Sequence, residues 1–239
     1  MLRMRRGAGR LYTYGMDSIL LIDKPKGITS AKAVALVKKR FRTKVGHTGT
    51  LDPLATGLLI LLTGKRTKQA STFLHMDKAY QVRAMLGITT TTYDVAGDVV
   101  KTCDKAVARE EMEEALKAFV GELLQVPPAY SAKKIGGKKA YELARQGLEV
   151  EIPASKVTAY SLQLLTFDYP NFTLECEVSS GFYVRSLVHD LGERLGVGAT
   201  VEEVRRIRVG AYRLENAVSL DVLLAEPVTT AVVPAPPQA

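Results

Sequence analysis

Apolar positions that alternate or recur with helical spacing run through most of the 239-residue chain. Alternation or a short apolar run predicts a strand, and recurrence every three or four residues predicts a helix. The expected strands are residues 19–22, 58–62, 78–86, 157–166, 173–179 and 204–214. The expected helices are residues 31–41, 65–74, 109–124, 140–145, 186–195 and 219–224. Residues 89–100 predict a polar loop with a turn at 94–98.

In this pattern the expected strands occur as neighbouring pairs, and they do not alternate regularly with helices. The best-defined strand is 78–86, where Tyr80, Val82 and Ala84 share one face. The pattern therefore favours an α+β fold with a mixed, mainly antiparallel sheet and flanking helices over a doubly wound parallel sheet.

Both ends of the chain differ from this pattern. Residues 1–15 are basic and lack the apolar region of a secretory signal. We expect a disordered extension there, either an RNA-binding arm or an upstream start with translation from Met16. Residues 227–239 are rich in proline and alanine and carry no charge, which predicts a disordered tail. One domain is expected over residues 16–226, with an insertion at about 125–150.

Composition narrows the class of protein. A hydrophobic content of 46% with 24% charged residues is typical of a soluble globular protein. The net charge of +8 favours a polyanionic partner, although charge alone does not separate RNA, DNA and an anionic membrane surface. No apolar run approaches the roughly 20 residues that a membrane helix needs.

Cysteine and histidine usage argues against disulfide and metal chemistry. The two cysteines, Cys103 and Cys176, form no CxxC motif, so a reducing cytoplasm is the expected location. The histidines His47, His75 and His189 lie far apart in the chain without HExxH spacing. We therefore expect no metal.

Residues 46–57, GHTGTLDPLATG, carry three glycines and one carboxylate, that of Asp52, directly before an apolar run. Glycines at this density permit tight bends or close approach to a ligand. On local pattern alone, Asp52-Pro53 is most simply a helix cap or turn. A carboxylate on a rigid turn between a flexible loop and a buried strand is also what a catalytic site needs. A phosphate-binding loop is excluded because six residues separate Gly57 from Gly64 and no Ser or Thr follows the lysine.

A lysine-rich stretch at 129–147 alternates basic side chains with two tyrosines. Basic groups meet phosphates and aromatic rings stack on bases, so the stretch is a candidate nucleic-acid patch. The alternative is a solvated helix with packed tyrosines. The basic residues are Lys133, Lys134, Lys138, Lys139 and Arg145.

Five blocks occur in the order of one known family. They are LIDKPKG at 21–27, GHTGTLDPLATG at 46–57, KAY at 78–80, PAYSAK at 128–133 and GFYVR at 181–185. From about Asp17 to Leu224 the chain resembles the bacterial tRNA pseudouridine synthase B family. The resemblance implies an isomerase that converts uridine 55 in the T loop of tRNA to pseudouridine. It also implies a mixed sheet crossed by an active-site cleft, and no cofactor.

The resemblance places the catalytic aspartate at Asp52 and its arginine partner at Arg185. Lys24 and Pro25 match a block that supports the loop, and the lysine-rich stretch corresponds to an insertion that closes on the T arm. Substrate contacts are implied at His47, Tyr80, Tyr183 and Val204.

Two departures from the family pattern stand out. Val204 is smaller than the aliphatic residue expected there, which predicts a looser fit. Family members commonly carry a PUA domain after the catalytic domain, and about fifteen largely uncharged residues follow Leu224. We therefore expect this RNA-binding module to be absent. The expected partner is the T stem-loop of tRNA, with a monomeric enzyme and no obligate protein partner.

The implied reaction breaks the glycosidic bond, rotates the uracil and rejoins it through C5. Flipping the base out costs a few kcal/mol, and stacking on the Tyr80 ring returns roughly 1–3 kcal/mol. His47 would fill the vacated space or stack on a neighbouring base. Arg185 would keep Asp52 ionised. Two roles stay open for Asp52, attack on the sugar C1′ and proton abstraction from the sugar. Tyr80 or Tyr183 is the candidate acceptor of the C5 proton.

Two other functions remain to be distinguished from this one. A non-catalytic RNA-binding or RNA-chaperone protein would use Asp52 only as a cap. A guide-RNA-dependent pseudouridine synthase shares the aspartate block but works with partner proteins.

Overall fold

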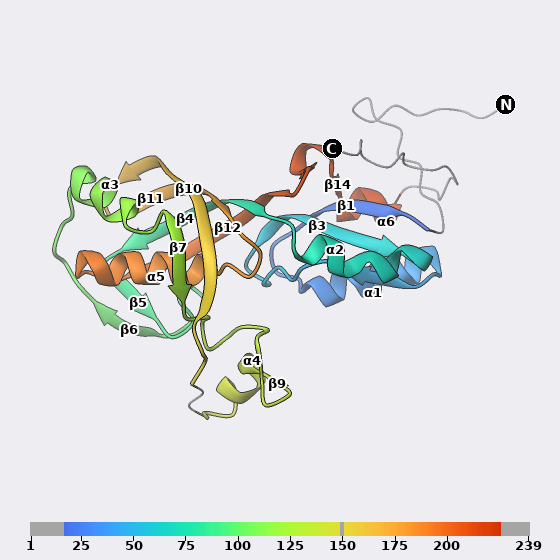
Figure 1. The fold of residues 1–239 in the computed structure, drawn as a ribbon, viewed down its shortest axis with the longest axis horizontal. Helices are drawn as coiled ribbons and strands as arrows, with labels where there is room; N and C mark the ends of the chain where they lie inside the picture. Colours follow the sequence, from blue (N-terminus) through green and yellow to red (C-terminus); the bar gives the residue numbers. More distant parts are fainter. Residues whose placement is uncertain (1–16, 149–150, 226–239) are drawn as a thin grey trace.

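The computed structural model describes residues 17–148 and 151–225. The predictions for residues 1–15, for a start at Met16 and for residues 227–239 lie outside the described residues. Within the described part, a ten-stranded sheet runs in the order β14-β1-β3-β12-β4-β11-β10-β7, with β13 beside β12 and β2 beside β3 (Figure 1). Among the strand pairs of this sheet in the described residues, only β1–β14 and β12–β3 are parallel. The predicted α+β fold, with a mixed and mainly antiparallel sheet, is confirmed.

The strands of this sheet are β1 (Ile19–Lys24), β2 (Val45–His47), β3 (Thr56–Thr63), β4 (Lys78–Leu86), β7 (Gly121–Gln125), β10 (Ser155–Asp168), β11 (Asn171–Val178), β12 (Ala199–Val209), β13 (Tyr212–Arg213) and β14 (Val218–Ser219). The helices are α1 (Ser30–Phe41), η1 (Gly64–Gln69), α2 (Ala70–Leu74), α3 (Arg109–Lys117), α4 (Ala140–Ala144), α5 (Val184–Leu195), η2 (Leu214–Asn216) and α6 (Leu220–Ala225). No helix in the described ranges is long and apolar enough to cross a bilayer.

Strand β3 is buried on both faces, which explains its continuous apolar sequence. Leu58 and Leu62 pack in one cluster with Phe73 of α2. Leu59 and Leu61 point to the other face and belong to the main core, to which α1 also contributes. This strand is a rigid base for the glycine-rich loop that precedes it.

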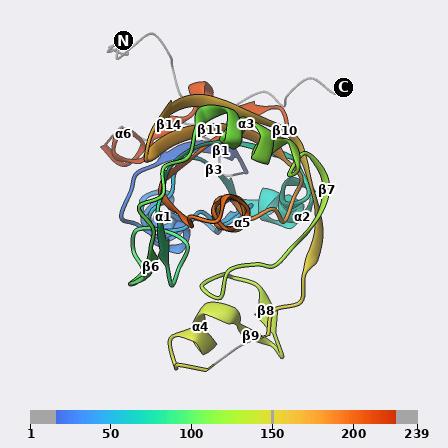
Figure 2. The ribbon, with the colours of Figure 1, turned by 90° about the vertical axis from the view of Figure 1, so that its left-hand side faces the viewer.

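Helix α5 lies beneath the arch of the sheet (Figure 2). Its residues Leu187, Val188 and Leu191 are fully buried in the main core. Gly192 permits the close packing, because a Cβ there would lie 2.2 Å from the Ala199 nitrogen at the start of β12. The packing fixes the N-terminal end of α5, where two predicted site residues lie.

Residues 129–148 project from the body of the molecule (Figures 1 and 2). They form a two-stranded hairpin, β8 (Lys134–Ile135) and β9 (Lys138–Lys139), followed by α4. Gly136 and Gly137 occupy its turn with positive φ angles of 56° and 84°, a conformation that glycine adopts without steric cost.

The expected helix at 109–124 is wrong in its second half. Helix α3 ends at Lys117, and β7 begins at Gly121, whose φ is 104°. Strand β7 pairs with β10 from Gly121 to Gln125, so cross-strand hydrogen bonds override the helical spacing of the apolar residues. Val120, expected in the core, is 49% exposed.

Other segments also differ from the prediction. The expected helix at 65–74 is a 3-10 helix, η1, followed by the short α2. The expected loop at 89–100 contains most of a hairpin, β5 (Ile88–Thr90) and β6 (Val99–Thr102). The expected strand at 204–214 begins earlier, at Ala199, and is broken by a turn at Gly210, whose φ is 52°. Pairing with the long β4 extends β12 toward its N-terminus.

Candidate active site

The 46–57 loop is fixed on both sides of Asp52 by buried backbone contacts. The Ser30 hydroxyl donates to the Leu51 carbonyl at 3.0 Å and accepts from the Leu51 amide at 2.8 Å. The Gly27 amide donates to the Pro53 carbonyl at 2.8 Å. Asp52-Pro53 forms a turn, closed by the Ala55 amide and the Asp52 carbonyl at 3.1 Å, and does not start a helix. The Asp52 side chain is left 46% exposed on a rigid backbone.

Arg185, in the first turn of α5, holds the Asp52 carboxylate. Its Nη2 lies 2.9 Å from Asp52 Oδ2, while the arginine side chain is only 8% exposed. The same guanidinium donates to the Thr92 carbonyl at 2.9 Å and the Tyr130 carbonyl at 2.8 Å. Its geometry is therefore set by the protein and not by solvent, and it presents a fixed positive charge to the carboxylate. The structure thus brings together the two residues predicted to pair.

A second carboxylate, that of Asp94, lies 3.3 Å from Arg185 Nη1 and is 8% exposed. Its Oδ1 accepts hydrogen bonds from the Thr92 hydroxyl at 2.7 Å and the Ala96 amide at 3.0 Å. Sequence reasoning placed this residue in a polar turn and gave it no role. The only local signal was an acid among threonines, which is also typical of an ordinary turn.

Two tyrosines stand within electrostatic reach of Asp52. Burial raises the pKa of Tyr80, and the charge and hydrogen bonding of Arg206 oppose that rise. Burial also raises the pKa of Tyr183, with the Ser131 hydroxyl opposing and the Asp52 charge adding to the rise. The Gln125 side chain fixes the Tyr183 backbone, donating to its carbonyl at 2.9 Å and accepting from its amide at 2.7 Å. Both phenols are therefore neutral at physiological pH.

His47 lies on β2 and is uncharged at neutral pH. Burial lowers its pKa, and the charges of Arg206 and Lys139 lower it further. Its Nδ1 is buried without a hydrogen-bond partner among the described residues. Because the Lys139 charge acts on His47, the projecting segment lies within electrostatic reach of the 46–57 loop.

Lys24 and Pro25, predicted to support the loop, are joined by a hydrogen bond, and Val204 is buried. The Lys24 ammonium, fully buried, donates to the Pro25 carbonyl at 2.9 Å and the Ile28 carbonyl at 2.7 Å. Burial lowers its pKa to about 8, and the Asp52 charge opposes that change. Val204 is 8% exposed in the main core, against which Tyr80 also packs.

The basic residues of the projecting segment are spread over its surface. Lys134 and Lys138 are exposed on the hairpin. Lys139 and Arg145 flank the Tyr141 ring, with their charged groups 5.4 Å and 5.5 Å from its centroid. Lys133 donates to the Ser155 hydroxyl at 3.0 Å. The five predicted patch residues are thus in one segment, where Lys134 and Lys139 are cross-strand partners.

Arg206, on β12, was given no role in the sequence analysis. Its side chain is 3% exposed, and its Nε donates to the Leu58 carbonyl at 2.8 Å. Its Nη2 donates to the Gly49 carbonyl at 3.3 Å. Both acceptors belong to the loop or to the strand that follows it, so Arg206 is a further anchor of the loop.

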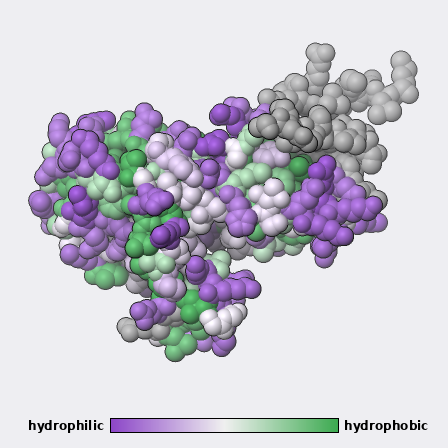
Figure 3. All heavy atoms as spheres, viewed as in Figure 1, coloured by the Kyte–Doolittle hydropathy of each residue, from purple (hydrophilic) through white to green (hydrophobic). Residues whose placement is uncertain are grey.

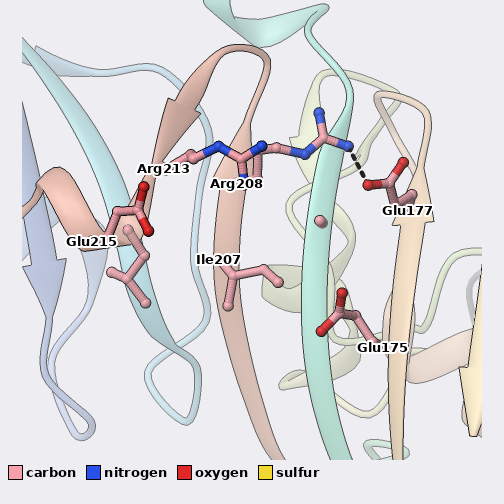
Figure 4. A pocket seen from close by; sticks show the side chains of 8 residues that line it. Glu175, Glu177, Ile207, Arg208, Arg213 and Glu215 are labelled. Atoms are coloured by element: carbon pink, nitrogen blue, oxygen red, sulfur yellow. Dashed lines mark ion pairs between the residues drawn. The ribbon is translucent and has the colours of Figure 1, made fainter. Parts of the chain in front are cut away.

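A pocket of about 230 Å³ lies between β4, β11 and β12 (Figure 4). The Arg208–Glu177 ion pair, 2.9 Å long, crosses it. It is lined by Ala79, whose side chain points to the face of β4 opposite Tyr80. None of the predicted site residues lines it. Among the described residues no group of three or more His, Cys, Asp and Glu has the arrangement of a metal site.

Comparison with known proteins identifies the chain's relatives. The model of the TruB family pseudouridylate synthase N-terminal domain matches residues 36–184, and that of the tRNA pseudouridylate synthase B C-terminal domain matches residues 185–231. The tRNA pseudouridine synthase B of Aquifex aeolicus is 48% identical over 213 residues, which are 88% of this chain and 74% of that protein. The enzyme of the same name from Caldicellulosiruptor saccharolyticus is 43% identical over 208 residues, 87% of this chain and 72% of that one.

Among solved structures, a Cbf5-Nop10-Gar1 complex matches with a TM-score of 0.70 and 28% identity. An archaeal box H/ACA sRNP Nop10-Cbf5 complex matches with a TM-score of 0.66 and 26% identity. Each alignment covers 87% of this chain, which spans about half the length of those two chains, 54% and 53% respectively.

Proposed function

Because the chain belongs to the TruB family of pseudouridylate synthases, we propose that it isomerises uridine 55 in the T loop of tRNA to pseudouridine. The observation that carries the proposal is the Asp52 carboxylate, half exposed on a fixed turn and 2.9 Å from a buried arginine. A reacting group must be reachable by substrate and held in one geometry, and this carboxylate meets both conditions.

Asp52 is the reacting residue, and Arg185 keeps it ionised and oriented. Oδ2 is the oxygen that faces the arginine, so Oδ1 is the oxygen left to react. An ionised carboxylate serves either proposed role, attack on C1′ or removal of a proton from the sugar. Asp94, on the other side of Arg185, shares the guanidinium charge and keeps it in place.

Tyr80 receives the flipped uracil on its ring, and His47 occupies the space that the base leaves. A neutral imidazole suits contact with an unpaired or stacked base, because it adds no charge that would need an anionic partner. Both tyrosine pKa values are raised by burial, so proton transfer from C5 by either phenol needs help from a neighbouring charge. Tyr80 has that help from Arg206, and Tyr183 has it from Arg185.

The tRNA backbone is bound by two basic regions. One is the projecting segment with Lys133, Lys134, Lys138, Lys139 and Arg145. The other surrounds α1 and η1, whose last turns carry Lys38, Lys39 and Arg40, and Arg66 and Lys68. Between Asp23 and Asp77 the only acidic residue is Asp52, so this end of the domain attracts phosphates. Hydrophilic residues gather at the right-hand edge of that end of the molecule (Figure 3).

The purified chain should act alone, as a monomer in the cytoplasm. We propose this because the curated relatives carry the name of a tRNA-modifying enzyme. The likeness to Cbf5 complexes keeps a guide-RNA-dependent enzyme as the second candidate.

The test is incubation of the purified protein with a free T stem-loop transcript, followed by quantification of pseudouridine at position 55. Formation of pseudouridine without guide RNA or other protein is the expected result. Product only after addition of a guide RNA and partner proteins would favour the second candidate. Binding without product under both conditions would leave a non-catalytic RNA-binding protein.

A further inference from the structure

Arg206 is a buried cation with no carboxylate partner among the described residues. Its neighbours in β12 are paired: Arg205 lies 2.7 Å from Asp23, and Arg208 lies 2.9 Å from Glu177. The partners of Arg206 are instead the Gly49 and Leu58 carbonyls, and Tyr80 is its cross-strand neighbour on β4, whose pKa the Arg206 charge lowers against the effect of burial. A buried charge without a countercharge is costly unless its hydrogen bonds are satisfied.

The surroundings add to that cost. Burial is the main reason that the pKa values of Lys24 and Lys78 are lowered to about 8. The charge of Arg206 contributes to both decreases. The Lys78 ammonium donates to the Leu74 carbonyl at 2.7 Å and to the Met76 carbonyl. An apolar side chain would fill the Arg206 position at a lower electrostatic cost. Retaining a third cation here therefore calls for a role that an apolar residue cannot fill.

The geometry indicates what that role is. The Gly49 carbonyl precedes Asp52 by three residues and the Leu58 carbonyl follows it by six, so Arg206 holds both ends of the segment that carries the carboxylate. In the sheet, Arg206 stands directly opposite Tyr80 on β4 and beside Gly57 on β3. A Cβ at Gly57 would lie 2.4 Å from the Arg206 carbonyl oxygen, so the backbones meet too closely for any other residue.

We propose that Arg206 is a positioning residue that couples the 46–57 loop to the Tyr80 ring. It holds the Asp52 carboxylate and the aromatic surface at one separation while the uracil is detached and turned between them. The inference rests on the proposed function, since that reaction has a free base that must be re-attached through another atom. An arginine suits the task because its planar group can serve several acceptors at once.

The experiment compares Arg206→Gln and Arg206→Lys with Arg205→Gln. Arg205 is the matched control because it is the adjacent residue and points to the opposite face of the sheet. Its guanidinium meets side chains, Asp23 at 2.7 Å and the Thr56 hydroxyl at 3.3 Å, whereas that of Arg206 meets the backbone carbonyls of Gly49 and Leu58. Single-turnover rates and the Kd for the T stem-loop are measured for each variant. Arg206→Gln should lower the rate by about 100-fold, the scale expected from a misplaced reacting group, with the Kd within about twofold of wild type. Arg206→Lys should recover part of the rate, and Arg205→Gln should match the wild type.

A double-mutant cycle separates positioning from general damage to the fold. Tyr80→Phe removes only the hydroxyl, the group on which the Arg206 charge acts, and it should slow the wild-type enzyme with little change in Kd. In the Arg206→Gln background it should have no further effect, because the connection is already broken. If Arg206→Gln does not fold, the same cycle is run with Arg206→Lys, which keeps the positive charge but loses the planar group that serves several acceptors.

A wild-type rate in Arg206→Gln, or additive effects in the cycle, would overturn the inference while leaving the proposed function intact. So would a rate loss matched by an equal loss of binding. If the wild-type protein itself formed no pseudouridine, the proposed function would fail first, and the two outcomes are therefore distinguishable.

Discussion

The 46–57 loop and the projecting segment at 129–148 are held in the fold in opposite ways. The loop is fastened by contacts from distant parts of the chain, through Ser30, Gly27 and Arg206. The projecting segment is stabilised mostly by local bonds, such as the Lys139 amide to the Glu142 side chain at 3.2 Å and the Ala140 amide to the Lys133 carbonyl at 2.8 Å. The 46–57 loop is therefore fixed by residues outside it, whereas the projecting segment is stabilised largely by its own hydrogen bonds.

The difference follows from what each region has to do. A carboxylate that reacts with one atom must be held to a fraction of an ångström, and this demands many buried anchors. Lysines that meet phosphates act through charge, which falls off gradually with distance. A segment attached at few points can therefore bind a polyanion well. The contrast predicts large losses of chemistry from changes in the loop and smaller, graded losses of binding from changes in the projecting segment.

The strongest test of the loop's part is Asp52→Asn. The side chain is half exposed, so the change should leave folding and tRNA binding intact. The rate of pseudouridine formation should fall by at least about 1,000-fold, since the reacting carboxylate is removed. Single-turnover assays with matched Kd and thermal-unfolding measurements check this. Asp23→Asn is the control for an aspartate paired with an arginine outside the loop, and substantial turnover by Asp52→Asn would contradict the assignment.

A smaller loss of rate is expected from Tyr80→Leu. Leucine fills the position with apolar volume but offers no ring to the base, and stacking is worth about 1–3 kcal/mol. The rate should therefore fall about 10- to 100-fold. A fluorescent base analogue next to the target uridine would report whether flipping is impaired. Tyr212→Leu, which removes a tyrosine packed on Phe73 in the other apolar cluster, controls for loss of an aromatic residue, and wild-type rates in Tyr80→Leu would remove its role.

Many of the strands and helices can be predicted from the sequence because they depend on local patterns. Strand β4 was predicted with its bounds, and Tyr80 was placed on the buried side, because alternation alone determines both. The pairing of Asp52 with Arg185 came from resemblance and is confirmed in the structure. The roles of both residues in the reaction remain predictions.

What the sequence missed depends on contacts between distant segments. Asp94 meets Arg185 only because a bridge to Val201 places its turn against β12. Arg206 faces the loop because of the registers of β12 with β3 and β4, and a neighbouring arginine on the other face has the same local pattern. The helix predicted through Val120 failed for the same reason, since pairing with β10 decides that segment.

Graded loss of binding is the expected result in the projecting segment. Replacing Lys133, Lys134, Lys138 and Lys139 by alanine should weaken tRNA binding and reduce the salt slope by about one for each phosphate that a lysine no longer neutralises. The rate at saturating RNA should stay near wild type. The double variant Lys134→Ala, Lys138→Ala changes only the two exposed hairpin lysines and should give part of the effect.

Arg109→Ala with Lys117→Ala is the matched control for this experiment. These cations lie on α3 and each is paired with a glutamate, at 2.7 Å and 2.6 Å. Their removal should leave the salt slope unchanged. An unchanged slope in the quadruple variant as well would make the lysines of the projecting segment a solvated surface and remove them from the RNA interface.

The smallest effect expected is a pH dependence of stability that comes from the buried Lys24. Burial lowers the pKa of Lys24 from 10.5 to about 8. Between these values the unfolded chain binds the proton and the folded chain releases it. The contribution of Lys24 to the free energy of unfolding therefore rises with pH across that window. Below about pH 8 the Lys24 side chain is charged, and the folded state bears the full cost of burying that charge. Above about pH 8 the side chain is a neutral amine, which still donates to the Pro25 and Ile28 carbonyls.

Urea unfolding of wild type and Lys24→Met from about pH 7.5 to 10.5 measures this contribution. The difference in unfolding free energy should shift toward the wild type as the pH rises, and the buried Lys78 cancels because both proteins contain it. Lys134→Met, on the exposed hairpin, is the matched loss of a lysine from the other region. A difference between wild type and Lys24→Met that stays flat across this range would mean that the loop is not supported by a buried ammonium. The contrast between the two regions would then rest on backbone contacts alone.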